Sequence, residues 1–538
     1  MPSAPTPRIL PAVPLYFNTA GPCRPERHYM IPALRRLPEA RPLLERGFYF
    51  VVHAPRQTGK TTAIRTLAEA LTASGSHAAL SLSCEAGSAA RDDYAEAQRG
   101  ILDDLRRRAE KALPPELRPP PFPEASPLSL LSSALTAWAR ACPRPLALFF
   151  DEIDALSGQS LEAVLRQLRA GYDDRPASFP ACVVLCGMRN VRDYKAASGG
   201  GPPRVGSSSP FNVIVESLRL GDFSAAEVAE LYAQHTAATG QIFSADAIAK
   251  VIEVTAGQPW LVNAIAREIV EKMAVPSSEP ITAAHVGEAR ERLVLARATH
   301  LDSLVARLEE PRVQRVIEPI LGGGFAPVDL TYSDDLAYLR DLGILALGSP
   351  VQIANPIYRE VIARVLADPV QSSLDLDRAA FVLPDGRIDL RKLLTDFAAF
   401  WQEQGDVLVG GMTYHEVAPQ LVLMAFLQKV VNGGGAIDRE YGLGRRRIDL
   451  LLRWPHRGDD GRRLVQREAM ELKVWRKGEK DPLAGGLVQL DGYLEGLGLR
   501  EGTLVIFDRR PAKHRTAAKP RLTRAKAPSG RKVVLLRL

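Results

Sequence analysis

Cysteine is scarce in this chain of 538 residues, which has five. Their number is odd and most lie in apolar, strand-like runs, which argues against a disulfide framework. Cys182 and Cys186 lie four apart in the run ACVVLCG, where a metal site is the alternative to two buried thiols. We interpret all five as thiols of a reducing compartment, namely Cys23, Cys84, Cys142, Cys182 and Cys186.

Long apolar runs are also lacking. No stretch approaches the roughly 18 apolar residues that mark a membrane-spanning helix. The stretch MPSAPTPRILPAVPLYF has no basic start, no clean apolar block and no small-residue cleavage site of a secretion signal. We therefore expect a cytoplasmic protein without a membrane partner.

Acidic residues are missing from the end of the chain. The formal net charge is +7, but Arg509 to Leu538 holds eleven Lys and Arg and no Asp or Glu. Such a run fits a nucleic-acid backbone, and a solvated basic loop is the alternative.

Composition divides the chain into four regions. Residues 1–45 form a leader, and residues 46–275 alternate apolar strands with amphipathic helices, as in an α/β domain with a parallel sheet. Residues 276–370 are predicted to form helices and a small two-stranded wing, in which VQIANPIY is the return strand. Residues 385–538 are predicted as a second α/β domain. Surface loops are expected at 113–127 and 197–210.

The strongest motif follows the predicted strand Phe48–His53. Backbone N–H groups of such a loop, together with the start of the following helix, cradle phosphate oxygens. Lys60 is placed to reach the β- and γ-phosphates of ATP, and the Thr61 hydroxyl to ligate Mg²⁺. Ala54 stands where a glycine is usual. The expected nucleotide-binding residues are Ala54, Pro55, Arg56, Gln57, Thr58, Gly59, Lys60, Thr61 and Thr62.

A second half-site follows in LALFFDEIDAL. The apolar strand ends in Asp151, a predicted Mg²⁺ and nucleotide ligand, and Glu152, a predicted general base for the attacking water. A helix-capping acidic pair is the alternative. The strand 181–187 is followed by Arg189, Asn190 and Arg192, which are candidates for sensing the γ-phosphate or for an arginine finger, with plain surface charge as the alternative.

The two motifs, together with the helices that flank Gly257-Gln258-Pro259 as a small lid, resemble the AAA-like P-loop ATPases of bacteria and archaea. The leader stretch FNTAGPCRPERHYM also resembles the segment before the phosphate loop in one AAA-like family. The resemblance covers roughly residues 15–370 with the wing. It implies a nucleotide switch, linked to an effector domain and able to form homo-oligomers through the ATPase.

A second constellation lies near the C-terminus, in GLGRRRIDLLLRW, REAMELKVW and GGLVQLDGYLEGL. Alternation along a strand puts Glu471 and Lys473 on one face, and pairing with the preceding strand can bring Asp449 beside Glu471. Two carboxylates there would suit Mg²⁺ or Mn²⁺. Lys473 would orient a water molecule or stabilise negative charge. Glu416 is a candidate third metal ligand, and Glu440 is the alternative.

This arrangement resembles the PD-(D/E)XK nuclease superfamily over residues 405–510, as a restriction-endonuclease-like α/β domain. The resemblance makes Asp449, Glu471 and Lys473 catalytic, with Gln489 and Tyr493 as the QxxxY helix of the RecB-like branch. It implies DNA as the usual substrate and a defence or mobile-element setting. The alternatives are a surface ion pair and a nuclease fold that has lost catalysis.

We expect an ATP-regulated, metal-dependent nuclease. The alternative is a signalling or DNA-binding ATPase whose last domain is a non-catalytic platform. A helicase lacks support, because the sequence shows neither a second RecA-like core nor strand-separating motifs.

Overall fold

The structure is a computed structural model. It describes residues 14–188, 213–296, 302, 304–321, 334–374, 376–411, 417–431, 434–443, 446–458, 461–510 and 520–538. The chain forms two compact units. The N-terminal unit comprises residues 1–302 and 329–358, and the C-terminal unit comprises residues 303–328 and 359–538. No helix within the described ranges has both the length and the apolar character needed to cross a bilayer.

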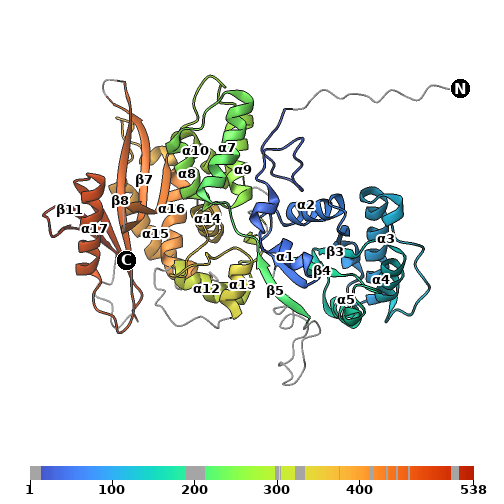
Figure 1. The fold of residues 1–538 in the computed structure, drawn as a ribbon. Coiled ribbons are helices and arrows are strands. Elements are labelled where there is room, and N and C mark those ends of the chain that lie inside the picture. The colour runs from blue at the N-terminus through green and yellow to red at the C-terminus, as the bar shows by residue number, and fades with distance from the viewer. Residues whose placement is uncertain are drawn as a thin grey trace. The chain divides into compact units, whose positions relative to one another are not determined.

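A parallel five-stranded sheet forms the centre of the N-terminal unit, in the order β2-β3-β4-β1-β5. Strands β3, β4 and β5 of this sheet are labelled in Figure 1. Strand β4 lies between β1 and β3, with Phe50 opposite Val184 and Phe150 opposite Leu185. Residues of β1 to β4 are buried on both faces, as expected for a sheet covered by helices on each side. The strands are β1 (Tyr49–His53), β2 (Ala78–Ser83), β3 (Leu146–Asp151), β4 (Cys182–Gly187) and β5 (Ile214–Arg219).

Alternation along β1 divides the core into two layers. Tyr49 and Val51 pack with the apolar faces of α3 (Tyr94–Ala112), α4 (Leu130–Ala141) and α5 (Gly158–Ala170). Phe50 and Val52 pack on the other face with α1 (Ala40–Glu45) and α2 (Lys60–Ala73). The carboxyl ends of β1 and β3 thereby reach the same edge of the sheet, where the phosphate loop begins.

Helices follow the sheet as predicted for a lid. They are α7 (Ala225–Thr239), α8 (Ala245–Thr255), α9 (Pro259–Arg267), which continues as a π-helix over Glu268–Lys272, and α10 (Ala283–Leu295). Ser224 and Glu227 form a capping box at the start of α7.

The predicted wing is smaller than expected. Helix α13 (Asp334–Asp341) is followed by one antiparallel bridge between Leu345 and Ile353. The return strand was predicted to extend through residues 356–358, and this is wrong, because Pro356 opens helix α14 (Pro356–Ser373). Proline lacks an N–H and is well tolerated in the first turn of a helix, so it favours this start. Helix α14 begins in the N-terminal unit and ends in the C-terminal unit.

A mixed six-stranded sheet, ordered β10-β11-β9-β8-β7-β6, forms the C-terminal unit. Strands β6, β7 and β8 pair antiparallel, β8 pairs parallel with β9, and β9 pairs parallel with β11. The strands are β6 (Ala436–Leu443), β7 (Arg446–Arg457), β8 (Arg463–Trp475), β9 (Glu501–Asp508), β10 (Arg521–Lys526) and β11 (Lys532–Arg537).

Helices cover both faces of this sheet. Helix α17 (Leu483–Leu497) packs on one face through Leu490, Tyr493 and Leu494. From α15 (Leu390–Gly411), Trp401 contacts Phe507 with ring centroids 5.0 Å apart. The unit also contains α12 (Pro311–Leu321) and α16 (Ala418–Val431). Part of the basic run after Arg509, for which a solvated loop was one interpretation, forms strand β10. Residues 511–519 lie outside the described ranges.

Candidate functional site

The phosphate loop lies between β1 and α2, where predicted. Gly59 has φ +94°, a left-handed conformation that glycine adopts without strain, and Gln57 has φ 60°. No side chain caps the N-terminus of α2. Its first backbone N–H groups therefore face the loop together with the positive end of the helix dipole, as an anion site requires.

Lys60 folds back over this loop. Its ammonium group donates to the carbonyl oxygens of Ala54 at 2.8 Å and Pro55 at 2.7 Å. Burial lowers the pKa of Lys60 from its usual value. An incoming phosphate would offer this desolvated cation an anionic partner in place of two neutral carbonyls.

Thr61 and Asp151 meet as the paired motifs predict. The Thr61 hydroxyl donates to Oδ2 of Asp151 at 2.7 Å, and the backbone N–H of Glu152 donates to Oδ1 at 3.0 Å. Burial raises the pKa of Asp151, which is 4% exposed. A hydroxyl and a carboxylate in contact beside the loop are the oxygen donors that suit Mg²⁺.

Glu152 is exposed, and its backbone has a left-handed φ of 55°. Its Oε2 accepts from the Ser83 hydroxyl at 2.8 Å. The negative charge of Glu152 is the main cause that raises the pKa of the neighbouring Glu85. The side chain is accessible and held at the tip of β3, where a general base for water would lie.

The remaining loop residues differ in exposure. Thr58 is 1% exposed and donates to the Pro55 carbonyl at 2.9 Å, and Ala54 is fully buried. The Thr62 hydroxyl accepts from the backbone N–H of Cys23 in the leader at 3.0 Å. Arg56 and Gln57 are exposed. The candidates Arg189, Asn190 and Arg192 lie outside the described residues.

A cavity beside the phosphate loop was not predicted from the sequence. The leader, the loop and the lid line it, with Tyr29, Gln57, Gly59, Phe223 and Trp260 among its walls. Trp260 is fixed by its indole N–H, which donates to the Thr19 carbonyl at 2.8 Å. In the sequence, only the resemblance of the leader stretch pointed to this region. The other residues that line the cavity are too far apart in the chain to form a local pattern.

Arg36 links this cavity to the loop. Its guanidinium donates to the Thr58 carbonyl at 2.9 Å and to the Gly221 carbonyl, and it lies over the Phe223 ring at 4.6 Å from the centroid. Burial lowers the pKa of Arg36. Arg36 is not among the residues predicted from the sequence.

In the C-terminal unit, β7 and β8 bring the predicted acidic pair together. Leu450 pairs with Met470, and the next step of this antiparallel register brings Asp449 to Glu471. Oδ2 of Asp449 accepts from the backbone N–H of Leu472 at 2.7 Å. Nζ of Lys473 lies 2.7 Å from Oε1 of Glu471. The three groups therefore lie together on one face of the sheet.

Glu471 is an unusual carboxylate, because it is 2% exposed. Burial and the charge of Asp449 raise its pKa to about 7, against the opposing effect of Lys473. Its Oε2 is buried and has no hydrogen-bond partner in the described part of the chain. Burying an unpaired charged oxygen is unfavourable, so this atom fits a cation ligand.

Of the carboxylates predicted to bind a metal in the C-terminal unit, the structure describes the side chains of two, Asp449 and Glu471. Glu416 lies outside the described residues, and the side chain of Glu440, on β6, is likewise not described. Among described side chains no group of three or more His, Cys, Asp or Glu could hold a metal. The donor set that remains, two carboxylates with one unpartnered oxygen, fits Mg²⁺ or Mn²⁺ in chemistry.

Gln489 and Tyr493 both lie on helix α17, as the predicted QxxxY helix requires, but they differ in burial. Tyr493 is 6% exposed and packs in the core, whereas Gln489 is exposed. Four residues turn a helix by about 400°, so the two side chains are offset by about 40° at the margin of the buried face.

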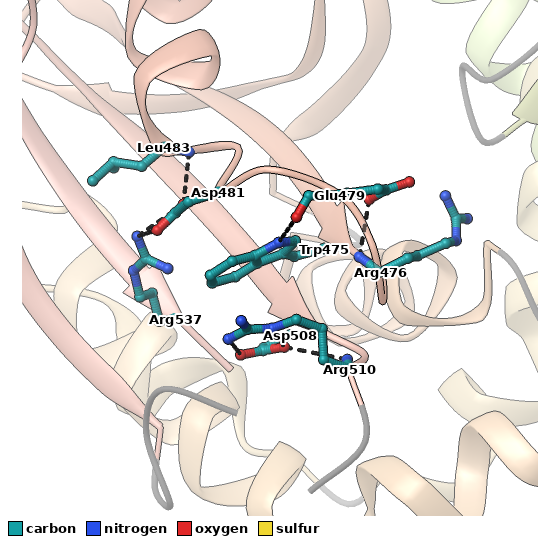
Figure 2. A network of polar contacts seen from close by, with 8 residues as sticks. All are labelled: Trp475, Arg476, Glu479, Asp481, Leu483, Asp508, Arg510 and Arg537. Atoms are coloured by element: carbon teal, nitrogen blue, oxygen red, sulfur yellow. Dashed lines mark hydrogen bonds and ion pairs between the residues drawn. The ribbon is translucent and has the colours of Figure 1, made fainter. Parts of the chain in front are cut away.

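Trp475 ends β8 two residues after Lys473, on the same face of the strand. Figure 2 shows its ring next to two arginine–carboxylate pairs, Arg510 with Asp508 and Arg537 with Asp481. The Arg510 guanidinium lies 3.3 Å from the ring centroid. This cluster, which we call the Trp475 cluster, fixes the ends of β8 and β9.

The comparisons with known proteins bear on the first site. Residues 45–194 match the model of a family described as AAA domain. No curated protein matches the chain.

Among solved structures, the Walker-type ATPase of Pyrococcus abyssi is 14% identical, with 64% of this chain and 99% of that chain covered and a TM-score of 0.46. RuvB of Thermotoga maritima, a Holliday junction branch migration motor, is 15% identical, with 61% and 93% covered and a TM-score of 0.33. Cdc6p of Pyrobaculum aerophilum is 14% identical, with 62% and 91% covered and a TM-score of 0.34. On the family match and the site geometry, residues 45–194 are a P-loop ATPase domain of the AAA class.

Proposed function

We propose that this protein is an ATP-regulated nuclease, in which the AAA domain binds and hydrolyses ATP and the C-terminal unit cuts phosphodiester bonds of DNA. The AAA domain supplies the nucleotide switch, through Lys60, Thr61 and Asp151. The observation that carries the nuclease part is the buried Glu471, whose Oε2 is unpartnered beside Asp449 and Lys473.

At the nuclease site, Asp449 and Glu471 would hold Mg²⁺ or Mn²⁺. When bound, the ion supplies positive charge against the scissile phosphate. Lys473 would leave its ion pair with Glu471 and donate to the attacking water or to a phosphate oxygen. Asp449 is kept in place by the backbone N–H of Leu472, which donates to Oδ2 at 2.7 Å.

At the ATPase site, Thr61 and Asp151 would hold Mg²⁺ with ATP. The ion offsets charge on the β- and γ-phosphates. The loop N–H groups and Lys60 bind the phosphates, and Glu152 accepts a proton from the attacking water. Homo-oligomers formed through the AAA domain are part of this proposal.

A basic surface supports a nucleic-acid partner. Arg521, Arg524 and Lys526 on β10 and Lys532 on β11 are exposed. They belong to the acid-free end of the chain, so phosphate groups of DNA would meet little repulsion along this edge of the sheet.

The test is a cleavage assay on single- and double-stranded DNA and RNA, with Mg²⁺ or Mn²⁺, and with ATP, ADP or no nucleotide. Glu471→Gln and Lys473→Ala should each abolish cutting while ATP hydrolysis persists. Glu468→Gln is the matched control, because Glu468 lies on the same strand but on its other face. Cutting by both variants at the parent rate would refute the nuclease assignment.

A second function is favoured by the same basic strands. The C-terminal unit would bind DNA as a non-catalytic platform for a signalling ATPase. Salt-sensitive binding of duplex DNA with no cleavage under any tested metal would favour this function over the first.

A further inference from the structure

The cavity beside the phosphate loop has the character of a site for a flat ring. Apolar side chains of Tyr29, Ile31, Leu231 and Trp260 line it, and the phosphate loop contributes Thr58 and Gly59. Sites for small ligands combine such apolar walls with a few polar groups that fix orientation. A nucleotide whose phosphates occupy the loop would place its base here.

Asn263 on α9 supplies a polar group in this cavity. Its side chain lines the cavity and is 8% exposed. The amide Nδ2 donates to the Pro259 carbonyl one turn earlier at 2.8 Å. That bond fixes the amide with Oδ1 as the free end, and Oδ1 has no hydrogen-bond partner among the described residues.

A buried acceptor without a donor is unfavourable, and a native structure keeps one where a ligand or water completes it. The exocyclic amino group of adenine is a donor. Guanine carries a carbonyl oxygen at the same position, so its acceptor would face the acceptor of Asn263. At the position that Asn263 would contact, adenine therefore presents a hydrogen-bond donor and guanine presents an acceptor.

We propose that Asn263 is a specificity-determining residue that selects adenine over guanine, by accepting a hydrogen bond from the adenine amino group. The proposal rests on the nucleotide binding of the proposed function and names the residue that reads the base. A site that hydrogen-bonds one ligand group discriminates against the analogue that lacks it, because the buried partner is then left unpaired.

The experiment measures binding of three nucleotides to the full chain by calorimetry. They are ADP, GDP and the diphosphate of purine riboside, which lacks the amino group. ADP should bind the parent roughly tenfold more tightly than the purine riboside compound, and GDP more weakly still. Diphosphates are used so that hydrolysis does not disturb the equilibrium.

The variant Asn263→Leu keeps the size of the side chain and removes the acceptor. It should bind ADP and the purine riboside diphosphate with equal affinity, so the tenfold preference disappears. A circular dichroism melt establishes that the variant is folded.

The outcomes separate the two proposals. If the parent binds none of the three nucleotides, the proposed ATPase function is at fault. If the parent binds ADP and the purine riboside diphosphate equally, or if Asn263→Leu keeps the preference, the role of Asn263 is refuted while nucleotide binding stands. The comparison of ligands on the parent decides the matter even where the Leu variant does not fold.

Discussion

Oδ1 of Asp341 lies 3.6 Å from Nδ1 of His53, the last residue of β1 before the phosphate loop. The contact is not an ion pair, because burial, with the cations Arg219 and Lys60, lowers the pKa of His53 to about 4. The charge of Asp341 is instead matched by Arg219, whose Nη1 lies 3.1 Å from the same oxygen. A neutral imidazole at the end of β1 therefore faces Asp341, the last residue of α13.

His53 should make stability depend on pH. Its folded pKa of about 4 is below the ordinary 6.5, so the unfolded chain binds more protons between these values, and stability rises with pH there. The stability is fully present above pH 6.5 and is lost as the pH falls toward 4. At pH 5 the free energy of unfolding should be about 2 kcal/mol lower than at pH 7, because a shift of one pKa unit corresponds to about 1.4 kcal/mol.

The check is the thermal midpoint of the N-terminal unit between pH 7 and pH 5, for the parent and for His53→Gln. The variant should show a smaller fall, because glutamine does not titrate. His456→Gln, in the C-terminal unit, is the control and should follow the parent. Parallel curves for parent and His53→Gln would contradict this account.

Gly343 should not tolerate a side chain. Its φ is +76°, and an added Cβ would lie 2.6 Å from Cγ of Pro55 in the phosphate loop. Gly343→Ala should destabilise the N-terminal unit by about 2 kcal/mol, from left-handed strain and crowding. Nucleotide affinity should fall as well, because Pro55 carries a carbonyl that Lys60 contacts.

Gly348→Ala is the matched control for this prediction. Gly348 follows in the same segment, and a Cβ there would have nothing within 4 Å. Denaturant melts and nucleotide titrations of the two variants provide the measurement. Equal behaviour of the two alanines would show that the contact with Pro55 does not constrain the loop.

Lys60→Ala tests whether the ATPase governs cleavage. The variant loses a charged donor to phosphate and should bind ATP roughly 10- to 100-fold more weakly. Nucleotide titration and DNA cleavage are measured on the same preparation, with Lys250→Ala on the lid as the control. Loss of both activities would mean that ATP binding licenses cutting, and loss of binding alone would mean independent modules.

Local pattern predicted the parts of both sites that lie on single strands and loops. Asp151 ends an apolar strand, and Glu471 and Lys473 are two apart on β8, so alternation and strand ends were enough to place them. Asn263, Tyr29 and Arg36 come together only through the tertiary fold. Strand β10 was missed because its basic residues read as a loop, and it is fixed by pairing with β11.

Helix α17 shows what the spacing of two residues does not predict. The spacing of Gln489 and Tyr493 predicts one shared face, yet only Tyr493 packs into the core. Sequence spacing gives the angle between two side chains but not the width of the face that the sheet buries. The cavity with Asn263 and the Trp475 cluster likewise depend on packing that spacing alone does not give.

The Trp475 cluster joins the ends of β8 and β9 beside the proposed nuclease site. Arg510 contacts Asp508 through Nε at 2.9 Å and Nη2 at 2.7 Å, and it stacks on Trp475. The indole N–H donates to the Glu479 carbonyl at 3.0 Å, and the N–H of Arg509 donates to the Trp475 carbonyl at 2.9 Å. Lys473 lies two residues before the tryptophan, so its strand is held from this end.

Arg510→Ala should therefore weaken cleavage although the variant keeps both Asp449 and Glu471. The loss of stacking and of the paired hydrogen bonds should destabilise the C-terminal unit and lower its thermal midpoint. Arg510→Lys keeps the charge but not the planar fork, so it should restore only part of the stability.

The control is Arg467→Ala. Arg467 is exposed and lies on β8, the strand of Lys473, so its removal should leave the thermal midpoint and the cleavage rate unchanged. Because Lys473 is affected only through its strand, the Arg510 variants should lower the turnover number more than the affinity for DNA, and an effect on DNA affinity alone would instead place Arg510 on the DNA-binding surface.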